Sequence, residues 1–389
     1  MAHNSSALTV EEVRSRLQYG LEVVKKPAQG KLAHDYLVPG GPYSEQWDWD
    51  AFFMGVALSA ENPAEAVYLK NWTLNFIENA SPEGKVAGCL TAAGWDPRLN
   101  HMKPFLAQGA YISSRLLNDF SWIKPHFDTL KRIALYRTQH LWSEKFGLGM
   151  WLDSMESGAD NNVSILEFPH ASVLACDLNA FLYRELQALG KIAGKLGDTT
   201  EEQKFSAQAQ ELRKRITQYL WNDQEKIFCN RFIVSERFIN RVNYSSFVPL
   251  WAGLAPMEEG RESIRRYLLS SEHLMAPYGI RSLTKQDHVY NNINMIKPHS
   301  NWQGPVWPIA NYIYLQALLR YGFKEEAKQL AQTISALVLR DIDETGGMHE
   351  NYDAETGKGL AAPGFVSWNL LVRNMIAEAE SGIDPFVIE

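Results

Sequence analysis

The sequence of 389 residues is poor in the features that mark disulfide-rich secreted proteins and membrane proteins. It has three cysteines, Cys89, Cys176 and Cys229, an odd number at distant positions, so we expect reduced thiols in a cytoplasmic protein. Residues 1–10 do not resemble a signal peptide, and no apolar run is long enough to span a membrane.

Positive charge is also scarce. The chain has 38 Lys and Arg against 45 Asp and Glu, a net charge of -7, and its basic residues form no long cluster. This balance argues against a nucleic-acid partner and against binding to an anionic membrane. The sequence has no Cys/His metal spacing, phosphate-binding glycine loop or dinucleotide fingerprint, so we expect no cofactor and no catalytic metal.

Aromatic residues, by contrast, are abundant. They make up 12% of the chain and include 12 Trp, many of them in loops that contain Gly and Pro. Flat rings in such loops indicate a binding cleft with aromatic walls. With 46% hydrophobic residues the chain can bury a large core, and its length permits two or three ordinary domains or one large toroid or barrel.

Apolar residues recur at helical spacing in segments that alternate with loops. A capping box at Thr9–Glu12 begins the first helix, which we expect to end near Lys26. Further helices are expected around Phe52–Leu58, Ala64–Phe76, 104–119, 124–142, 170–196, 199–221, 245–254, 257–270, 305–321, 323–338 and after Pro363 to Ser381, with a short hairpin within 228–242.

The connections between these helices alternate between tight turns and long loops. Helices joined by tight turns are antiparallel, so in a closed ring of hairpins every long loop emerges on one face. We therefore predict an all-α (α/α)6 barrel with a single catalytic domain at 1–389. The absence of a linker or fixed-period repeat argues against separate domains and against an open solenoid.

The segment 155–162, Met-Glu-Ser-Gly-Ala-Asp-Asn-Asn, is rich in turn formers and predicts a loop that presents polar groups. Asp160 in this loop, close to Trp151, Met155 and Phe168, would have its pKa raised by desolvation, as a general acid near neutral pH requires. The alternative is that the polar residues of this segment only cap or turn the backbone.

A second candidate acid is Glu350, which follows Gly346-Gly347 in the last long loop. The alternative is a solvated loop carboxylate, and Asp353 and Glu355 are competitors. Placed across one cleft from Asp160, Glu350 could act as the base that activates water for glycoside hydrolysis.

A third loop contains two tryptophans, Trp302 and Trp307, around a Gly-Pro corner. An indole can cover the apolar face of a sugar, and we expect Trp302 to do so; Trp307 fits equally well as a core residue at the start of a helix.

Together, four motifs resemble the inverting (α/α)6 glycosidases of the clan that includes the trehalases and glycoside hydrolase family 63. The motifs lie between Tyr43 and Trp368, and the length is most similar to that of the short members that hydrolyse glucosylglycerate or mannosylglycerate. They are Trp49-Asp50, Glu156-Ser157-Gly158-Ala159-Asp160-Asn161, Asn301-Trp302-Gln303-Gly304-Pro305-Val306-Trp307, and Glu350-Asn351-Tyr352 with Thr356-Gly357.

The resemblance implies that Asp160 is the general acid and Glu350 the general base. It places in the sugar-binding site the residues Tyr43, Trp47, Trp49, Asp50, Trp302, Gln303 and Trp307. Relatives often have Gln-Pro-Pro where this chain has Lys103-Pro104-Phe105, so Lys103 is a candidate for binding an acidic aglycone; a solvent-facing lysine is the alternative. Arg281 is a second candidate, because its guanidinium can bind a carboxylate with two hydrogen bonds.

The predicted reaction is hydrolysis of a small α-glucoside or α-mannoside with inversion, with 2-O-α-glucosylglycerate or mannosylglycerate as the first choice of substrate. An α-glucosidase acting on short oligosaccharides or trehalose-like disaccharides is the alternative. A sugar epimerase or isomerase using His170, His299 or His349, and a non-catalytic sugar-binding protein, remain as other classes. The sequence leaves a homo-oligomer open.

Overall fold

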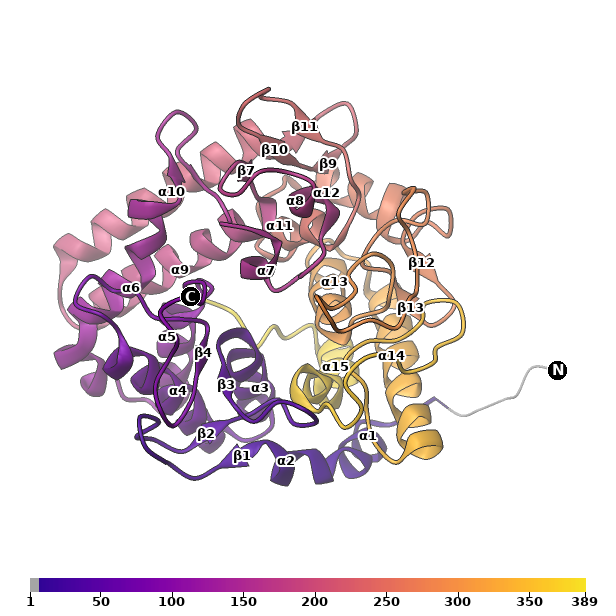
Figure 1. Ribbon diagram of the computed structural model, residues 1–389, viewed down its shortest axis with the longest axis horizontal. Coiled ribbons are helices and arrows are strands. Elements are labelled where there is room, and N and C mark those ends of the chain that lie inside the picture. Colours follow the sequence, from indigo (N-terminus) through magenta and orange to yellow (C-terminus); the bar gives the residue numbers. More distant parts are fainter. Residues whose placement is uncertain (1–6) are drawn as a thin grey trace.

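The computed structural model describes residues 7–389, so the first six residues of the predicted domain lie outside the described part. The fold is an all-α (α/α)6 barrel, as predicted (Figure 1). Its α-helices are α1 (Val10–Arg16), α2 (Gln18–Val24), α3 (Asp48–Glu61), α4 (Val67–Asn79), α5 (Leu106–Leu116), α6 (Phe127–His140), α7 (Ser154–Ser157), α8 (Val163–Leu166), α9 (Cys176–Lys195), α10 (Thr199–Leu220), α11 (Val248–Trp251), α12 (Met257–Ser263), α13 (Pro308–Arg320), α14 (Lys324–Thr345) and α15 (Val372–Ser381).

Short 3₁₀ helices, one π-helix and very short strands complete the described elements. The 3₁₀ helices are η1 (Pro63–Ala66), η2 (Ser121–His126), η3 (Tyr244–Phe247) and η5 (Ser367–Leu371). The π-helix is η4 (Ile264–Leu268). The strands are β1 (Lys25–Lys26), β2 (Tyr36–Leu37), β3 (Gln46–Trp47), β4 (Cys89–Leu90), β5 (Trp142–Ser143), β6 (Leu148–Gly149), β7 (Val173–Leu174), β8 (Trp221–Asn222), β9 (Ile227–Phe228), β10 (Asn230–Phe232), β11 (Phe238–Ile239), β12 (Met275–Ala276) and β13 (Gly279–Ile280).

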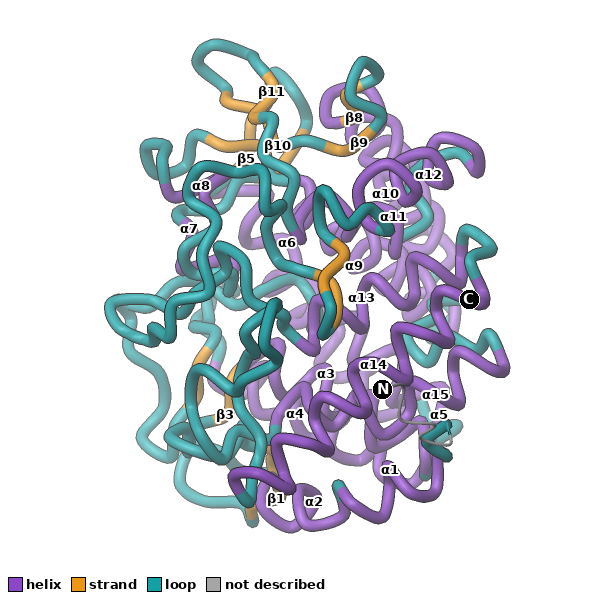
Figure 2. Tube along the Cα trace, turned by 90° about the vertical axis from the view of Figure 1, so that its right-hand side faces the viewer, coloured by secondary structure: helices purple, strands orange, loops and turns teal. Residues whose placement is uncertain are grey.

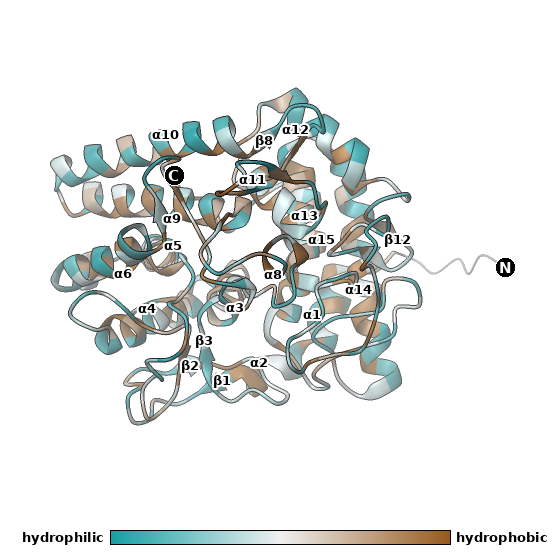
Figure 3. Cartoon of the chain, turned by 45° about the horizontal axis from the view of Figure 1, so that its top comes forward, coloured by the Kyte–Doolittle hydropathy of each residue, from teal (hydrophilic) through white to brown (hydrophobic). Residues whose placement is uncertain are grey.

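The inner ring consists of helical segments that are buried on nearly every side: α3, α5, α9, η3 with α11, α13, and η5 with α15. Each of these segments contacts the next, and α15 returns to contact α3, which closes the ring. Outer helices alternate with them along the chain. The outer helix α10 buries a single stripe that includes Phe205, Leu212 and Ile216, and its remaining surface is largely hydrophilic (Figure 3).

The long connections gather along one side of the ring of helices (Figure 2). This is the expected consequence of antiparallel hairpins, because each inner helix begins at the same face. Residues far apart in the sequence, such as those before α3 and those after α14, are therefore brought to one surface.

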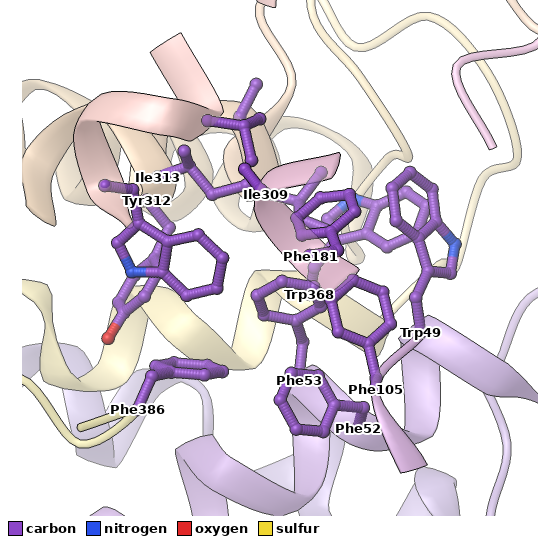
Figure 4. Close-up of a cluster of buried hydrophobic side chains, with 14 of the residues drawn as sticks. Trp49, Phe52, Phe53, Phe105, Phe181, Ile309, Tyr312, Ile313, Trp368 and Phe386 are labelled. Carbon is purple, nitrogen blue, oxygen red and sulfur yellow. The ribbon is translucent and has the colours of Figure 1, made fainter. Parts of the chain in front are cut away.

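The centre of the ring is filled by aromatic side chains (Figure 4). Phe386, in the segment after α15, is fully buried between the inner helices, with its ring centroid 5.2 Å from that of Phe53 and 5.5 Å from those of Phe52 and Tyr312. The C-terminal segment thus crosses the ring and closes its core.

Several predicted boundaries differ from the structure. The first predicted helix is two helices, α1 and α2, separated at Leu17, and α14 runs to Thr345 rather than 338. The predicted hairpin is confirmed, since β10 and β11 pair antiparallel. The Asp160 segment is not entirely loop, because α7 forms one helical turn there. Within residues 7–389, no helix combines the length and apolar character needed to cross a membrane.

Candidate active site

A pocket with a cavity volume of ≈ 190 Å³ opens on the loop side of the barrel. Three carboxyl groups line it: Asp50 from α3, Asp160 from the loop after α7, and Glu350 from the loop after α14. The barrel therefore brings the two predicted catalytic acids into one cavity, although they are distant in sequence. Of the predicted substrate-binding residues, the pocket is lined by Tyr43, Trp47, Trp49, Asp50, Lys103 and Trp307.

A buried ion pair anchors the loop that carries Asp160 to the outer helix α6. Arg137 of α6 donates to Glu156 at 2.8 Å, and both side chains are 2% exposed. Glu156 also accepts the backbone N–H of Leu152 at 2.6 Å. Glu156, the first residue of the Glu156–Asn161 motif, thus ties the single turn α7 to the outer helix α6.

Gly158 lets this loop turn into the pocket. Its φ of +81° is a left-handed conformation that favours glycine. A Cβ atom there would lie 2.7 Å from Lys103 and 2.7 Å from the Trp49 ring, closer than real contacts allow. Both the backbone angle and the packing therefore require glycine two residues before Asp160.

Among residues 7–389, hydrogen bonds hold the Asp160 carboxyl through one of its two oxygens only. Its Oδ2 atom accepts hydrogen bonds from the Ser300 backbone N–H at 3.0 Å and from the Ser300 hydroxyl at 2.8 Å. Burial raises the pKa of Asp160, while the Ser300 donors and the charges of Lys103 and His299 oppose the rise. A carboxyl group that can hold a proton, and whose other oxygen is not bonded by the described residues, is suited to donate to a leaving group.

Glu350 is positioned by its backbone. Its N–H donates to the carbonyl of Ala361 at 2.9 Å, and its carbonyl accepts from the indole N–H of Trp368 at 3.2 Å. The Oε2 atom is buried without a hydrogen-bond partner among the described residues. Burial raises the pKa of Glu350 to about 8, the nearby Asp50 and Asp160 add to the rise, and Tyr43 lowers it through a hydrogen bond. This unpartnered oxygen is available to a water molecule or a sugar.

Asp50 is the third carboxyl group in the pocket. It lies in the first turn of α3, and its Oδ1 accepts a hydrogen bond from the Ser367 hydroxyl at 2.6 Å. Burial raises its pKa to about 7, and the Ser367 bond opposes that rise. With Asp50 near Glu350, the two groups disfavour each other's ionisation.

The aromatic walls differ in one respect from the prediction. Trp307 lines the pocket, whereas Trp302, the preferred residue, lies behind it and is stacked on it at 4.1 Å between centroids. Trp302 also packs against Trp49 at 6.0 Å. The Trp307 indole N–H donates to the carbonyl of Asn301, which fixes its orientation. Trp302 thus supports the wall, and Trp307 forms it.

Gln303 and Arg281 are not among the described residues that line the pocket. The side-chain amide of Gln303 donates to the carbonyl of Asn161 and accepts from Asn291. It thus connects the loop that carries Asp160 to the loop that carries Trp307. Arg281 donates to Glu355 at 3.0 Å and to Met275. The guanidinium expected to bind a substrate carboxylate is thus engaged by a carboxylate of the protein.

Several lining residues were not among the predicted catalytic or substrate-binding residues, although Met155 and Gly158 lie in the predicted Asp160 segment. They are Pro39, Met155, Gly158, Ile296, Ser300, Phe365 and Trp368. Ser300 directly precedes the Asn-Trp-Gln-Gly-Pro motif, which could have identified it. Phe365 and Trp368 lie within the predicted last helix, and the tertiary structure places them at the pocket.

The three histidines considered for an isomerase do not line the pocket formed by the described residues. His170 is exposed, and His349 is paired with Asp341 at 2.8 Å. The remaining one, His299, is close enough to Asp160 for its charge to influence the pKa of that acid.

Comparison with known proteins places the chain in a family. Residues 43–368 match the family model described as the mannosylglycerate hydrolase MGH1-like glycoside hydrolase domain. The chain belongs to this glycoside hydrolase family. The resemblance to family 63 noted in the sequence is thereby confirmed.

Curated relatives of this MGH1-like domain are similar over part of their length. A probable mannosyl-oligosaccharide glucosidase of Schizosaccharomyces pombe is 25% identical over 226 residues, which is 54% of this chain and 27% of that protein. The mannosylglycerate hydrolase of Rubrobacter radiotolerans is 26% identical over 190 residues, 49% of this chain and 40% of that one. The matches therefore span less than half of these relatives.

Solved structures share the fold of the MGH1-like domain at low identity. The family 63 mannosylglycerate hydrolase from Thermus thermophilus, in complex with glucose, has a TM-score of 0.68 at 19% identity, covering 92% of this chain and 99% of that one. The neutral trehalase of Saccharomyces cerevisiae has a TM-score of 0.70 at 17% identity, covering 98% and 83%. These similarities establish the (α/α)6 barrel.

Proposed function

We propose that this protein hydrolyses a small α-glucoside or α-mannoside with inversion of the anomeric centre. The observation that carries the proposal is that Asp160 and Glu350 line one sugar-sized pocket together. Membership of the MGH1-like glycoside hydrolase family supports the reaction class.

In the proposed mechanism, Asp160 gives its proton to the glycosidic oxygen as the bond to the anomeric carbon breaks. Glu350 takes a proton from a water molecule that attacks the opposite face of the sugar. Inversion needs the two carboxyl groups roughly 6.5 to 9.5 Å apart, so that the water fits between Glu350 and the sugar. The unpartnered Oε2 of Glu350 supports its role as the group that receives this proton.

The other lining residues fit the binding of a sugar ring. Trp49 and Trp307 present indole surfaces to the pocket, and Asp50 adds a carboxyl group able to bind hydroxyl groups. An apolar ring face against an indole, with hydroxyl groups bound at the edge, is the usual division of contacts for a carbohydrate.

Stereochemistry provides the direct test. Proton NMR during hydrolysis of an α-linked substrate should detect the β-hexose before mutarotation. An α-hexose as the first product would refute inversion.

The two acids can be distinguished by the leaving group. Asp160→Asn should lower kcat by at least about two orders of magnitude on a natural glycoside, but much less on a glycosyl fluoride, whose leaving group needs no protonation. Glu350→Gln should be equally impaired on both substrates. The reverse pattern would exchange the two roles, and near-wild-type rates would remove either residue from the mechanism.

The substrate panel follows from the sequence and from the relatives. It contains 2-O-α-glucosylglycerate, mannosylglycerate, trehalose and short α-glucosides, with released hexose as the signal. Glycerate glycosides are the first choice from sequence resemblance, and the neutral disaccharides represent the glucosidase and trehalase relatives.

A further inference from the structure

The charges around the pocket determine which aglycone, the group that leaves with the glycosidic oxygen, can bind there. Asp50, Asp160 and Glu350 line the pocket, and Asp48 is buried beside it. Among the described residues that line the pocket, Lys103 is the only one with a basic side chain. A substrate carboxylate bound in this pocket could therefore form an ion pair with a lining residue only if Lys103 were free to bind it.

Lys103 is already neutralised by the protein. Its Nζ lies 3.1 Å from Asp48 Oδ1, and the two side chains are 9% and 1% exposed. The backbone N–H of Lys103 donates to the other Asp48 oxygen at 2.7 Å, and the ammonium group lies 4.9 Å from the centroid of the Trp49 ring. Neither a solvent-facing lysine nor a cation without a partner, Lys103 forms half of a buried ion pair.

The other candidate cations are engaged or lie outside the lining. Arg281 binds Glu355 and Tyr290. Lys297 is exposed and His299 partly buried on the loop before Ser300, and neither is among the described lining residues. The side chains at the rim are instead apolar, with Met155 49% and Ile296 38% exposed.

We infer that the aglycone of the substrate is uncharged, a neutral polyol or sugar with an apolar face, and not a carboxylate such as glycerate. This rests on the proposed glycosidase function and revises the glycerate glycoside expected from the sequence. Glu350 must lose its proton before it can activate water, so a substrate carboxylate in this pocket would face that negative charge with no unpaired cation from the described lining residues, and like charges in a partly desolvated site repel each other. A neutral aglycone avoids this repulsion and can pack on the apolar rim.

A matched pair of substrates tests the inference. 2-O-α-glucosylglycerol and 2-O-α-glucosylglycerate, with the mannosyl pair assayed beside them, differ by a hydroxymethyl group in place of a carboxylate. We expect kcat/KM to be higher for the neutral member by about tenfold or more, the scale of one unscreened charge contact. Equal values, or a preference for glycerate, would overturn the inference while leaving the glycosidase function intact. Failure to cleave any α-glycoside of the panel would instead refute the proposed function, and the inference with it.

Two variants distinguish a neutralised lysine from a carboxylate-binding one. Asp48→Asn/Lys103→Met removes both charges together, so the ratio of the two kcat/KM values should change by less than about threefold. A loss of about tenfold on glycerate alone would show that Lys103 binds the carboxylate, against the inference. Asp48→Asn alone leaves Lys103 unpaired and should shift the ratio towards glycerate; if this variant does not fold, the double variant still decides, because it leaves no unpaired buried charge.

Discussion

The buried ion pair between Arg137 and Glu156 supports the loop that carries Asp160, so we expect its loss to lower both stability and catalysis. Arg137→Met leaves the carboxyl group of Glu156 buried at 2% exposure without its cation. Removing one partner of a buried pair typically costs about 3 to 5 kcal/mol, because the remaining charge is uncompensated. The variant should therefore lose about this much of the free energy of unfolding.

The expected change in melting temperature follows from the size of the chain. An unfolding entropy of about 2.1 cal/mol/K per residue gives about 0.8 kcal/mol/K for this protein, so the loss corresponds to a fall of about 4 to 6 °C. The loop carrying Asp160 should also lose its fixed position, which lowers kcat on any cleaved α-glycoside. Circular dichroism melting curves at pH 7 and steady-state kinetics measure the two effects.

The double variant Arg137→Met/Glu156→Gln is the matched control. It removes both charges and keeps an oxygen that can accept the N–H of Leu152. We expect it to recover at least about half of the lost melting temperature. An Arg137→Met variant that melts within about 1 °C of the wild type, or a double variant less stable than the single one, would refute the reasoning.

Three further outcomes follow from the structure. The folded protein binds the Glu350 proton more tightly than the unfolded chain does, since its pKa is raised from 4.5 to about 8, so the stability this group contributes is lost as pH rises through that range. Glu350→Gln should accordingly melt above the wild type at pH 8 while its turnover falls, and a lower melting temperature there would contradict this. Phe386→Ala should cost about 3 to 5 kcal/mol, equally at pH 5 and pH 8, because it opens a cavity in a fully buried aromatic core; melting curves showing no loss would exclude that role. Gly158→Ala should lower both kcat and stability, by about 1 kcal/mol or more for the left-handed backbone alone, and wild-type kinetics would show that the loop tolerates a Cβ.

Local signals accounted for most of the fold. The helix at Thr199 begins where predicted because the preceding Asp198 caps it, accepting the N–H of Glu201. The predicted end of α14 was early, because the apolar Ile342 and buried Asp341 continue the helix until the left-handed Gly346 stops it. Helix starts are thus set by residues close in sequence, whereas the length of a buried helix depends on the neighbours it packs against.

The sequence by itself determined the alternation of helices and long loops, and with it the ring that gathers Asp160 and Glu350 at one pocket. Capping residues and apolar spacing act over a few residues, so they can be recognised without the rest of the chain. Only the tertiary structure decided which loop side chains face the cavity. Lys103 is neutralised by Asp48, Arg281 by Glu355, and Trp302 is covered by Trp307. These outcomes depend on partners that folding brings together, because a buried charge or ring is oriented by whatever packs against it.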